Sequence, residues 1–246
     1  MNMLTFLLFI SLVSHSVTEK QPFGLEERLG EVLPADVILT DENSTQVQFG
    51  DIISKPTLLT FVYYRCDVLC PKTLEGIAEL VNYTGAVPGH DYNIVTVSIN
   101  HDETPEEAKK AKNQYVNLIR KSISENFWKF YVADSNAIRK LTGAAGWEFR
   151  KDGDNFVHTT SSLLVTPDGK ISQYFYGTYF NYMHFAMSAE IAEREEVLPT
   201  RLKNLKYCYN YKPVNNRKVV IITTIFGVSM ILIVIVFFII LNFRKV

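Results

Sequence analysis

"LLTFVYYRCDVLCPKTLEGIAEL", residues 58–80, joins an apolar run to two cysteines and a helical pattern. Residues 57–64 form a continuous run of apolar, aromatic and β-branched side chains, which is typical of a strand buried on both faces. Pro71 suits the first turn of a helix, and apolar residues then recur at helical spacing at Leu74, Ile77, Ala78 and Val81. The stretch therefore predicts a buried strand, a loop carrying Cys66, and a helix that holds Cys70 in its first turn.

Strands and helices alternate along the rest of the chain between its two apolar ends. The pattern predicts two short strands within 35–53, strands at 93–99 and 128–134, helices within 102–121, 135–141 and 182–195, and a hairpin over 159–177. Pro167, Asp168 and Gly169 supply the turn of the hairpin. This order favours an α/β fold in which helices flank a central mixed sheet. A cysteine pair that follows the first central strand and opens a helix makes the pattern similar to the thioredoxin fold.

Both ends of the chain are unusually apolar. Residues 4–13 have the length of a signal-peptide core, and the small residues Ser14 and Ser16 favour cleavage before Val17. Residues 219–241 carry no charge and can cross a bilayer, which needs about 20 apolar residues. The predicted organisation is a signal peptide at 1–16, a lead-in segment at 17–34, a thioredoxin-like domain at 35–197, a juxtamembrane linker at 198–218, a transmembrane helix at 219–241 and a cytoplasmic tail at 242–246. The main domain is expected outside the cytoplasm, in the periplasm or at the outer face of the cytoplasmic membrane.

Composition and cysteine count limit the classes of function that the chain can have. The formal net charge is −1, so the chain lacks the basic excess of a nucleic-acid-binding protein. Three cysteines in 246 residues do not form a disulfide scaffold. A disulfide between Cys66 and Cys70 would close so short a loop that it gains little chain entropy. We therefore expect the pair to be reactive or metal-binding, with a structural disulfide as the weaker alternative.

The place of the pair at a helix N-terminus decides what it can do. The helix dipole and free N–H groups favour the thiolate, which is the nucleophile of thiol–disulfide exchange and also a soft-metal ligand. Thioredoxin-like redox motifs have two residues between the cysteines, whereas here three intervene, Asp67, Val68 and Leu69. With Cys70 in the first helical turn and Cys66 in the loop before it, the two sulfurs can converge on one point. A metal clamp and a reversible redox couple both remain open.

The loop before the predicted hairpin carries a candidate third ligand. In thioredoxin-like oxidoreductases a cis-proline usually packs there against the cysteines. The corresponding segment, "DNFVHTTSSLLV" at 154–165, has no proline and has His158 near that position. Two thiolates and one imidazole make a site suited to Cu(I), or with a fourth ligand to Cu(II) or zinc. A lone histidine of this kind is otherwise an ordinary surface or core residue.

Three segments together resemble the Sco/SenC family of copper proteins. They are "FVYYRCDVLCP" at 61–71, "VSINHDET" at 97–104 and "FVHTTSSLLVTPDGKISQYFYG" at 156–177. The resemblance covers residues 30–195 and implies a thioredoxin-like, membrane-anchored, extracytoplasmic protein. It further implies help in delivering copper to the CuA centre of cytochrome c oxidase. By position, the copper ligands implied are Cys66, Cys70 and His158.

The chain departs from the family pattern at three positions and in its anchor. Asp67 stands where the family usually has proline, Asn100 replaces an acidic residue, and His101 stands where proline is common. The usual membrane anchor is N-terminal, whereas a C-terminal one is predicted here. His101, Asp102 and Glu103 could bind metal, but we interpret them as a solvated loop and helix cap.

Two functions follow from these observations. The first is a copper chaperone, not an enzyme, whose partners are the copper-bearing oxidase subunit, the membrane, and another copper chaperone or a thiol reductase. The second is a thiol–disulfide oxidoreductase in which Cys66 and Cys70 cycle and reduce exported proteins such as an oxidase subunit. A peroxiredoxin-like peroxidase is disfavoured, because the proline and threonine that usually precede its cysteine are absent before Cys66. Cys208, beyond the domain, is expected to be an inert thiol.

Overall fold

The computed structural model describes residues 25–121, 125–153, 155–198 and residue 229. The chain divides into two compact units after Leu198, and every element named below belongs to the first unit. Apart from residues 198 and 229, the predicted signal peptide, linker, transmembrane helix and tail lie outside the described residues. Within the described part, no helix has the length and apolar character needed to cross a membrane.

A mixed sheet forms the centre of the first unit, with the strand order β2-β1-β5-β4-β3-β8-β9. Its strands are β1 (Ile38–Asp41), β2 (Gln46–Gln48), β3 (Thr57–Val62), β4 (Asn93–Ser98), β5 (Trp128–Val132), β8 (Ser161–Val165) and β9 (Ile171–Tyr176). The three central strands β3, β4 and β5 are parallel, and antiparallel strands complete both sides. Every residue of β3 is buried, as the apolar and β-branched character of its sequence predicts, and every residue of β8 is buried as well. The expected mixed sheet is confirmed.

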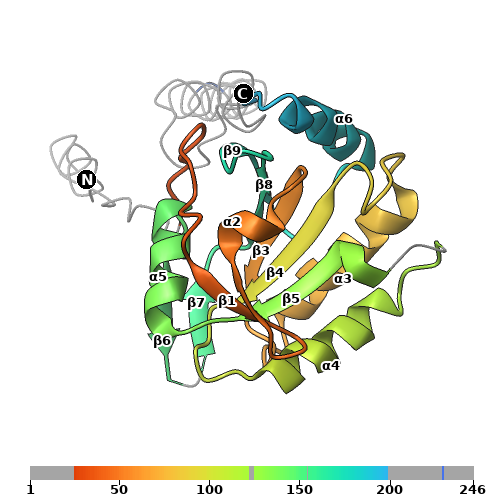
Figure 1. Cartoon of the computed structure of the whole chain (residues 1–246). Helices are drawn as coiled ribbons and strands as arrows, with labels where there is room; N and C mark the ends of the chain where they lie inside the picture. The colour runs from red at the N-terminus through yellow and green to blue at the C-terminus, as the bar shows by residue number, and fades with distance from the viewer. Residues whose placement is uncertain (1–24, 122–124, 154, 199–228, 230–246) are drawn as a thin grey trace, which may run out of the picture. The chain divides into compact units, whose positions relative to one another are not determined.

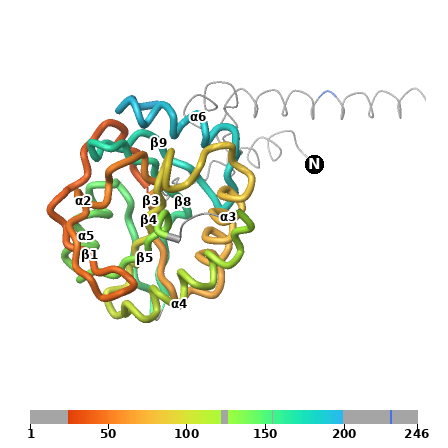
Figure 2. The backbone as a smooth tube through the Cα atoms, turned by 45° about the vertical axis from the view of Figure 1, so that its right-hand side comes forward, coloured from red at the N-terminus to blue at the C-terminus, as the bar shows by residue number. Residues whose placement is uncertain are grey.

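Helices cover the sheet on both sides. They are α2 (Phe49–Ile52), α3 (Leu69–Tyr83), α4 (Pro105–Val116), α5 (Ser135–Ala144) and α6 (Tyr182–Glu193), with a short 3₁₀ helix at Glu125–Phe127. Figure 1 shows α5 on the left and α3 with α4 on the right, with the sheet between them. Figures 1 and 2 both place α6 and α4 at opposite ends of the unit. This arrangement fits the thioredoxin-like fold.

Local chemistry accounts for where two of the helices begin and one ends. Thr104 and Glu107 form a capping box at the start of α4, and the Asp134 side chain accepts two N–H groups at the start of α5. α4 ends before residue 121, because Asn82 of α3 takes up the backbone that follows. Its amide donates to the Leu118 carbonyl at 3.1 Å and accepts from the backbone N–H of Arg120 at 2.7 Å. The helical pattern in the sequence continues to residue 121, but these hydrogen bonds to Asn82 end the helix earlier.

A second sheet of two strands, β6 (Phe149–Asp152) and β7 (Asn155–His158), was not predicted. The signal is present in the sequence, since Asp152 and Gly153 form the dipeptide most typical of tight hairpin turns. Gly153 adopts a φ of 62°, which a residue with a side chain rarely tolerates. The strands themselves are mostly exposed, so they lack the apolar pattern that marked the central strands.

The described part of the lead-in segment packs onto the domain. Leu25 pairs with Trp147, and the Leu33 N–H donates to the Gly169 carbonyl at 2.9 Å. The Tyr176 hydroxyl donates to Glu27 at 2.6 Å. Residues 25–34 are therefore part of the folded domain and not only a polar segment that leads into it.

The topology brings three distant loops to one edge of the sheet. The carboxyl ends of the parallel strands β3 and β4 meet there, so the loop after β3 lies beside the loop after β4. β8 runs antiparallel to β3, and Ser162 near its start pairs with Thr60 near the end of β3. The loop that precedes β8 therefore arrives at the same edge. The first two loops carry Cys66 and Glu103, and His158 ends β7 immediately before the third loop.

Candidate metal and thiol centre

The loop between β3 and α3 carries the two cysteines. β3 ends at Val62, and the Cys66 N–H returns to the Tyr63 carbonyl at 3.2 Å to form a turn. α3 begins at Leu69 after Val68, and no side chain caps its first N–H groups. The backbone N–H groups of Val68 and Cys70 instead lie close enough to the Cys66 sulfur to lower the pKa of its thiol. The start of α3 therefore favours the thiolate form of Cys66.

The two thiols differ in their acidity. Cys66 is half-buried, and burial by itself opposes its ionisation, but the N–H groups of Val68 and Cys70 and the Tyr63 hydroxyl lower its pKa overall. Cys70 is 2% exposed, and burial raises the pKa of its thiol well above the ordinary value. Both cysteines are free in this structure. An accessible thiolate beside a buried thiol is the arrangement that thiol–disulfide exchange uses.

His158, the last residue of β7, lies beside Cys70. Its Nε2 is 3.9 Å from the Cys70 sulfur, and its Nδ1 is 3.1 Å from the Thr159 carbonyl. A proton on Nδ1 donated to that carbonyl leaves the lone pair of Nε2 directed at the sulfur. Burial lowers the pKa of His158, which favours the neutral imidazole that a metal requires.

The spacing of Cys70 and His158 fits a metal ion between them. Metal–sulfur and metal–nitrogen bonds of about 2.3 and 2.0 Å at a trigonal metal set the two ligand atoms about 3.7 Å apart. The observed 3.9 Å is within a small side-chain movement of that value. Among the described residues, however, no group of three or more His, Cys, Asp or Glu side chains is already arranged to hold a metal. Adding Cys66 to the pair requires a side-chain adjustment on binding.

Glu103 holds the cysteine loop in place through hydrogen bonds, and the prediction that Glu103 is solvated is wrong. The side chain is 5% exposed, and its two oxygens accept the backbone N–H groups of Tyr64 and Arg65, each at 2.8 Å. The Ser98 hydroxyl donates to it at 2.6 Å. Burial raises the pKa of Glu103, although these hydrogen bonds oppose the shift. His101 and Asp102 are exposed, as the prediction of a solvated loop requires.

Tyr63 is a second residue of the centre that the sequence did not single out. Its hydroxyl contacts the Cys66 sulfur and donates to Asn155 at 3.3 Å, which links the cysteine loop to β7. Its ring meets the edge of the His158 ring at 6.4 Å. The apolar strand pattern around Tyr63 gives no sign of this role, because the side chain is buried like its neighbours.

Comparisons with known proteins identify the family and support the fold. The family model for SCO1/SenC matches residues 33–192. No curated protein sequence matches the chain. A candidate electron transfer protein from Aquifex aeolicus VF5 is 26% identical with a TM-score of 0.61, over 68% of this chain and 95% of that one.

Two further solved structures are similar in fold. ScoI from Bradyrhizobium japonicum, solved with copper bound, is 23% identical with a TM-score of 0.50, over 68% of this chain and 99% of that one. BsSco, described as having a disulfide switch and as a member of the Sco family of cytochrome c oxidase assembly proteins, is 19% identical with a TM-score of 0.52. That match covers 68% of this chain and 96% of BsSco. Because the family model spans more than half of its residues, the chain belongs to the SCO1/SenC family.

Proposed function

We propose that this chain is a copper chaperone that binds copper through Cys66, Cys70 and His158 and assists assembly of the CuA centre of cytochrome c oxidase. The observation that carries the proposal is the 3.9 Å approach of His158 Nε2 to the Cys70 sulfur at the loop that also holds Cys66. Copper bound to the Bradyrhizobium relative and the description of BsSco as an assembly protein support it. The chain is held at the membrane by residues 219–241, with the domain outside the cytoplasm.

Copper is the cargo in this proposal, and the protein groups prepare its ligands. Cys66 is the first sulfur to ionise, because the start of α3 lowers its pKa. Copper binding must displace the proton of Cys70, whose pKa burial raises, so binding releases a proton. His158 is neutral and needs no deprotonation at Nε2. Three soft or borderline ligands favour Cu(I), which a recipient cysteine site can take over by ligand exchange.

A His158→Ala variant tests the three-ligand site. The full-length reduced chain, in detergent, is titrated with Cu(I) against a competing chelator. We expect affinity to fall by about 100-fold or more, since even the outer hydrogen-bond partners of metal ligands contribute about 10–100-fold. His90→Ala is the matched control, because His90 is exposed in a turn and pairs with Asp91. Equal affinity of His158→Ala and the unmodified chain would exclude the three-ligand site.

Thiol–disulfide exchange is the second candidate function, and the unequal thiols favour it. An accessible Cys66 of lowered pKa and a buried Cys70 suit attack and resolution of a substrate disulfide. Reduction of an exported disulfide-containing protein without copper, at equal rates in His158→Ala and the unmodified chain, would make this the primary activity. Cys70→Ser would then trap a mixed disulfide through Cys66.

A further inference from the structure

A cavity of about 220 Å³ opens beside the two sulfurs, between the cysteine loop, α3 and α4. Cys66 and Cys70 form part of its wall, and Pro71, Leu74 and Ala111 make an adjoining apolar surface. His158 is not among its lining residues, so the cavity is separate from the space between Cys70 and His158. A molecule bound here could reach Cys66 without entering the space between Cys70 and His158.

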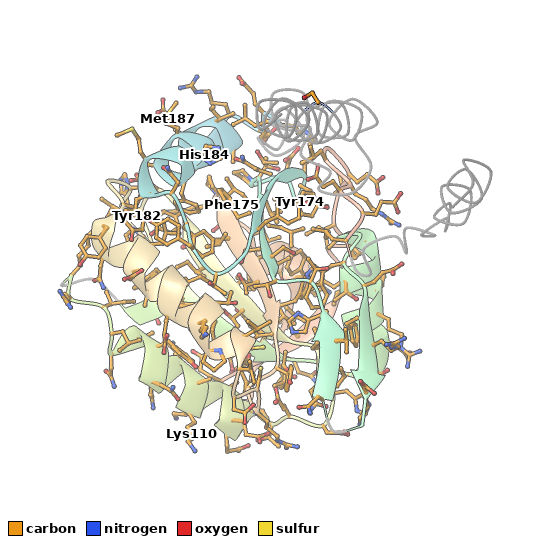
Figure 3. The ribbon with its side chains drawn as sticks, turned by 180° about the vertical axis from the view of Figure 1, so that it is seen from behind. Lys110, Tyr174, Phe175, Tyr182, His184 and Met187 are labelled. Atoms are coloured by element: carbon orange, nitrogen blue, oxygen red, sulfur yellow. The ribbon has the colours of Figure 1, made fainter. Side chains whose placement is uncertain are left out.

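The charges around this cavity leave one cation uncompensated. Arg65 donates to both oxygens of Glu107, at 2.6 and 3.0 Å, so these two lining residues neutralise each other. Lys110 lies one turn farther along α4 and is exposed at the rim, where Figure 3 shows it at the end of the domain away from α6. Among the described residues it has no hydrogen-bond or ion-pair partner. The exposed Gln114 adds a neutral polar group to the lining.

Size and charge together define the ligand. The volume lies below the roughly 300–1,000 Å³ of pockets that hold drug-sized molecules, so the cavity suits a small one. A sulfur in the wall favours a thiol, and an unpaired ammonium at the rim favours an anion. We propose that the cavity binds a low-molecular-weight thiol bearing a carboxylate, which reduces a Cys66–Cys70 disulfide and restores the dithiol that copper binding needs. This inference rests on the proposed function, which requires both sulfurs in the reduced state.

The reduction consumes two small thiols. The thiolate of the first attacks the sulfur of Cys66, which is half-exposed, rather than that of Cys70, which is 2% exposed. The S–S bond breaks, and Cys70 leaves as a thiolate that takes up a proton. The second thiolate attacks the small molecule's sulfur in the mixed disulfide and releases Cys66. Two electrons pass to the protein, and the small thiols leave as their own disulfide.

Three thiols of similar size and different charge test the site. The full-length chain with Cys208→Ser, in detergent and oxidised at Cys66 and Cys70, is reduced with mercaptoacetate, β-mercaptoethanol or cysteamine. Samples are quenched with acid, alkylated and counted for free thiols by mass spectrometry. For each thiol the rate of a variant is divided by that of the unmodified residue, which removes the intrinsic reactivity of the thiol.

Lys110→Glu is the informative variant, and Lys109→Glu is its control. Lys109 is also exposed on α4 but does not line the cavity. We expect Lys110→Glu to slow reduction by mercaptoacetate about fivefold, to leave the rate with β-mercaptoethanol unchanged and to raise the rate with cysteamine. These effects should be smaller at high salt. Lys109→Glu should leave all three ratios near one. Equal ratios for the three thiols, or equal effects of the two variants, would overturn the inference.

The Cu(I) affinity of the same reduced variants separates this inference from the proposed function. Lys110→Glu should bind copper as tightly as the unmodified chain within about twofold, because Lys110 is outside the ligand set. A charge-dependent reduction rate in a chain that binds no copper would establish the thiol site and remove the chaperone function. Tight copper binding together with a reduction rate that does not depend on the charge of the thiol would support the chaperone function and overturn the thiol site.

Discussion

The cysteine loop and the β6–β7 hairpin meet at one centre but are held in different ways. The loop follows β3, whose residues are all buried, and Glu103, which itself accepts a hydrogen bond from Ser98 of β4, fixes the loop through two hydrogen bonds. The hairpin forms a sheet of its own with mostly exposed strands. Its His158 packs against the ring of Trp147, with centroids 5.0 Å apart, and makes hydrogen-bond contacts with the Thr159 carbonyl and the Cys70 sulfur. The sulfurs are thus placed by the core and the imidazole by a few individual contacts.

This difference indicates how the centre responds to change. Damage to the support of the cysteine loop should reduce the stability of the whole unit, because the loop is continuous with the central sheet. Damage to the hairpin should alter the position of His158, and with it metal affinity, at a smaller cost in stability. Three substitutions test this contrast, beginning with the largest expected effect.

Glu103→Leu should have the largest effect. It removes the acceptor of the Tyr64 and Arg65 N–H groups and of the Ser98 hydroxyl, at about 1 kcal/mol for each hydrogen bond, so we expect a loss of about 3 kcal/mol. Urea unfolding of the full-length chain measures this change. Alkylation of Cys66 should also become faster, because the loop loses its anchor.

Two other variants control for size and charge. Glu103→Gln keeps one acceptor oxygen and should lose about half as much stability. Glu106→Gln removes a charge from the exposed first turn of α4 and should change stability by less than about 0.5 kcal/mol. If Glu103→Leu matched Glu106→Gln, the carboxylate would not support the loop.

Trp147→Phe should have an intermediate effect on stability and a clear effect on copper. Trp147 is 1% exposed, and its indole N–H donates to the Ser161 hydroxyl at 3.0 Å. Losing that bond and part of the ring should destabilise the domain by about 2 kcal/mol. Cu(I) affinity should fall by about 10-fold, because the His158 ring loses part of its platform.

Phe149→Leu provides the comparison for this variant. Phe149 packs against Trp147 at 6.1 Å and is the β6 partner of His158 in the strand register, but among the described residues its ring makes no contact with the His158 ring. It should therefore lower stability without a matching loss of copper affinity. Equal losses of affinity in the two variants would mean that general loosening of the hairpin, rather than the ring contact between Trp147 and His158, determines the imidazole position.

The elements that the sequence predicts well are those whose neighbours are close in the chain or uniformly buried. The strand at 57–62 and the helix after it follow from an apolar run and a helical repeat, and Asp134 marks the start of α5 by its residue type. The fold pattern predicts that His158 lies near the cysteine pair, and the structure places it beside Cys70. The assignment of these residues as copper ligands stays a prediction.

The parts that the sequence does not predict depend on partners far along the chain. Glu103 looks like one more acid before a helix, yet it accepts N–H groups almost forty residues earlier. Tyr63 looks like part of a buried strand, and only its contact with Cys66 shows a second role. Lys110 and Lys109 are equivalent in the helical pattern, and the fold alone places one of them at the cavity.

The pH dependence of stability should provide the smallest and most specific effect. Burial lowers the pKa of His158 below its unfolded value of about 6.5, so the unfolded chain binds a proton more readily near that pH. Stability contributed by the neutral imidazole is therefore present above pH 6.5 and lost as pH falls through the folded pKa. His158→Gln should flatten this part of the curve in urea unfolding of the copper-free chain. Val157→Thr, an exposed change on the same strand, should run parallel to the unmodified chain. If the pH dependence of the unfolding free energy were the same in His158→Gln as in the unmodified chain, the imidazole would not be desolvated in the folded state. The contacts of the hairpin would then not bury His158.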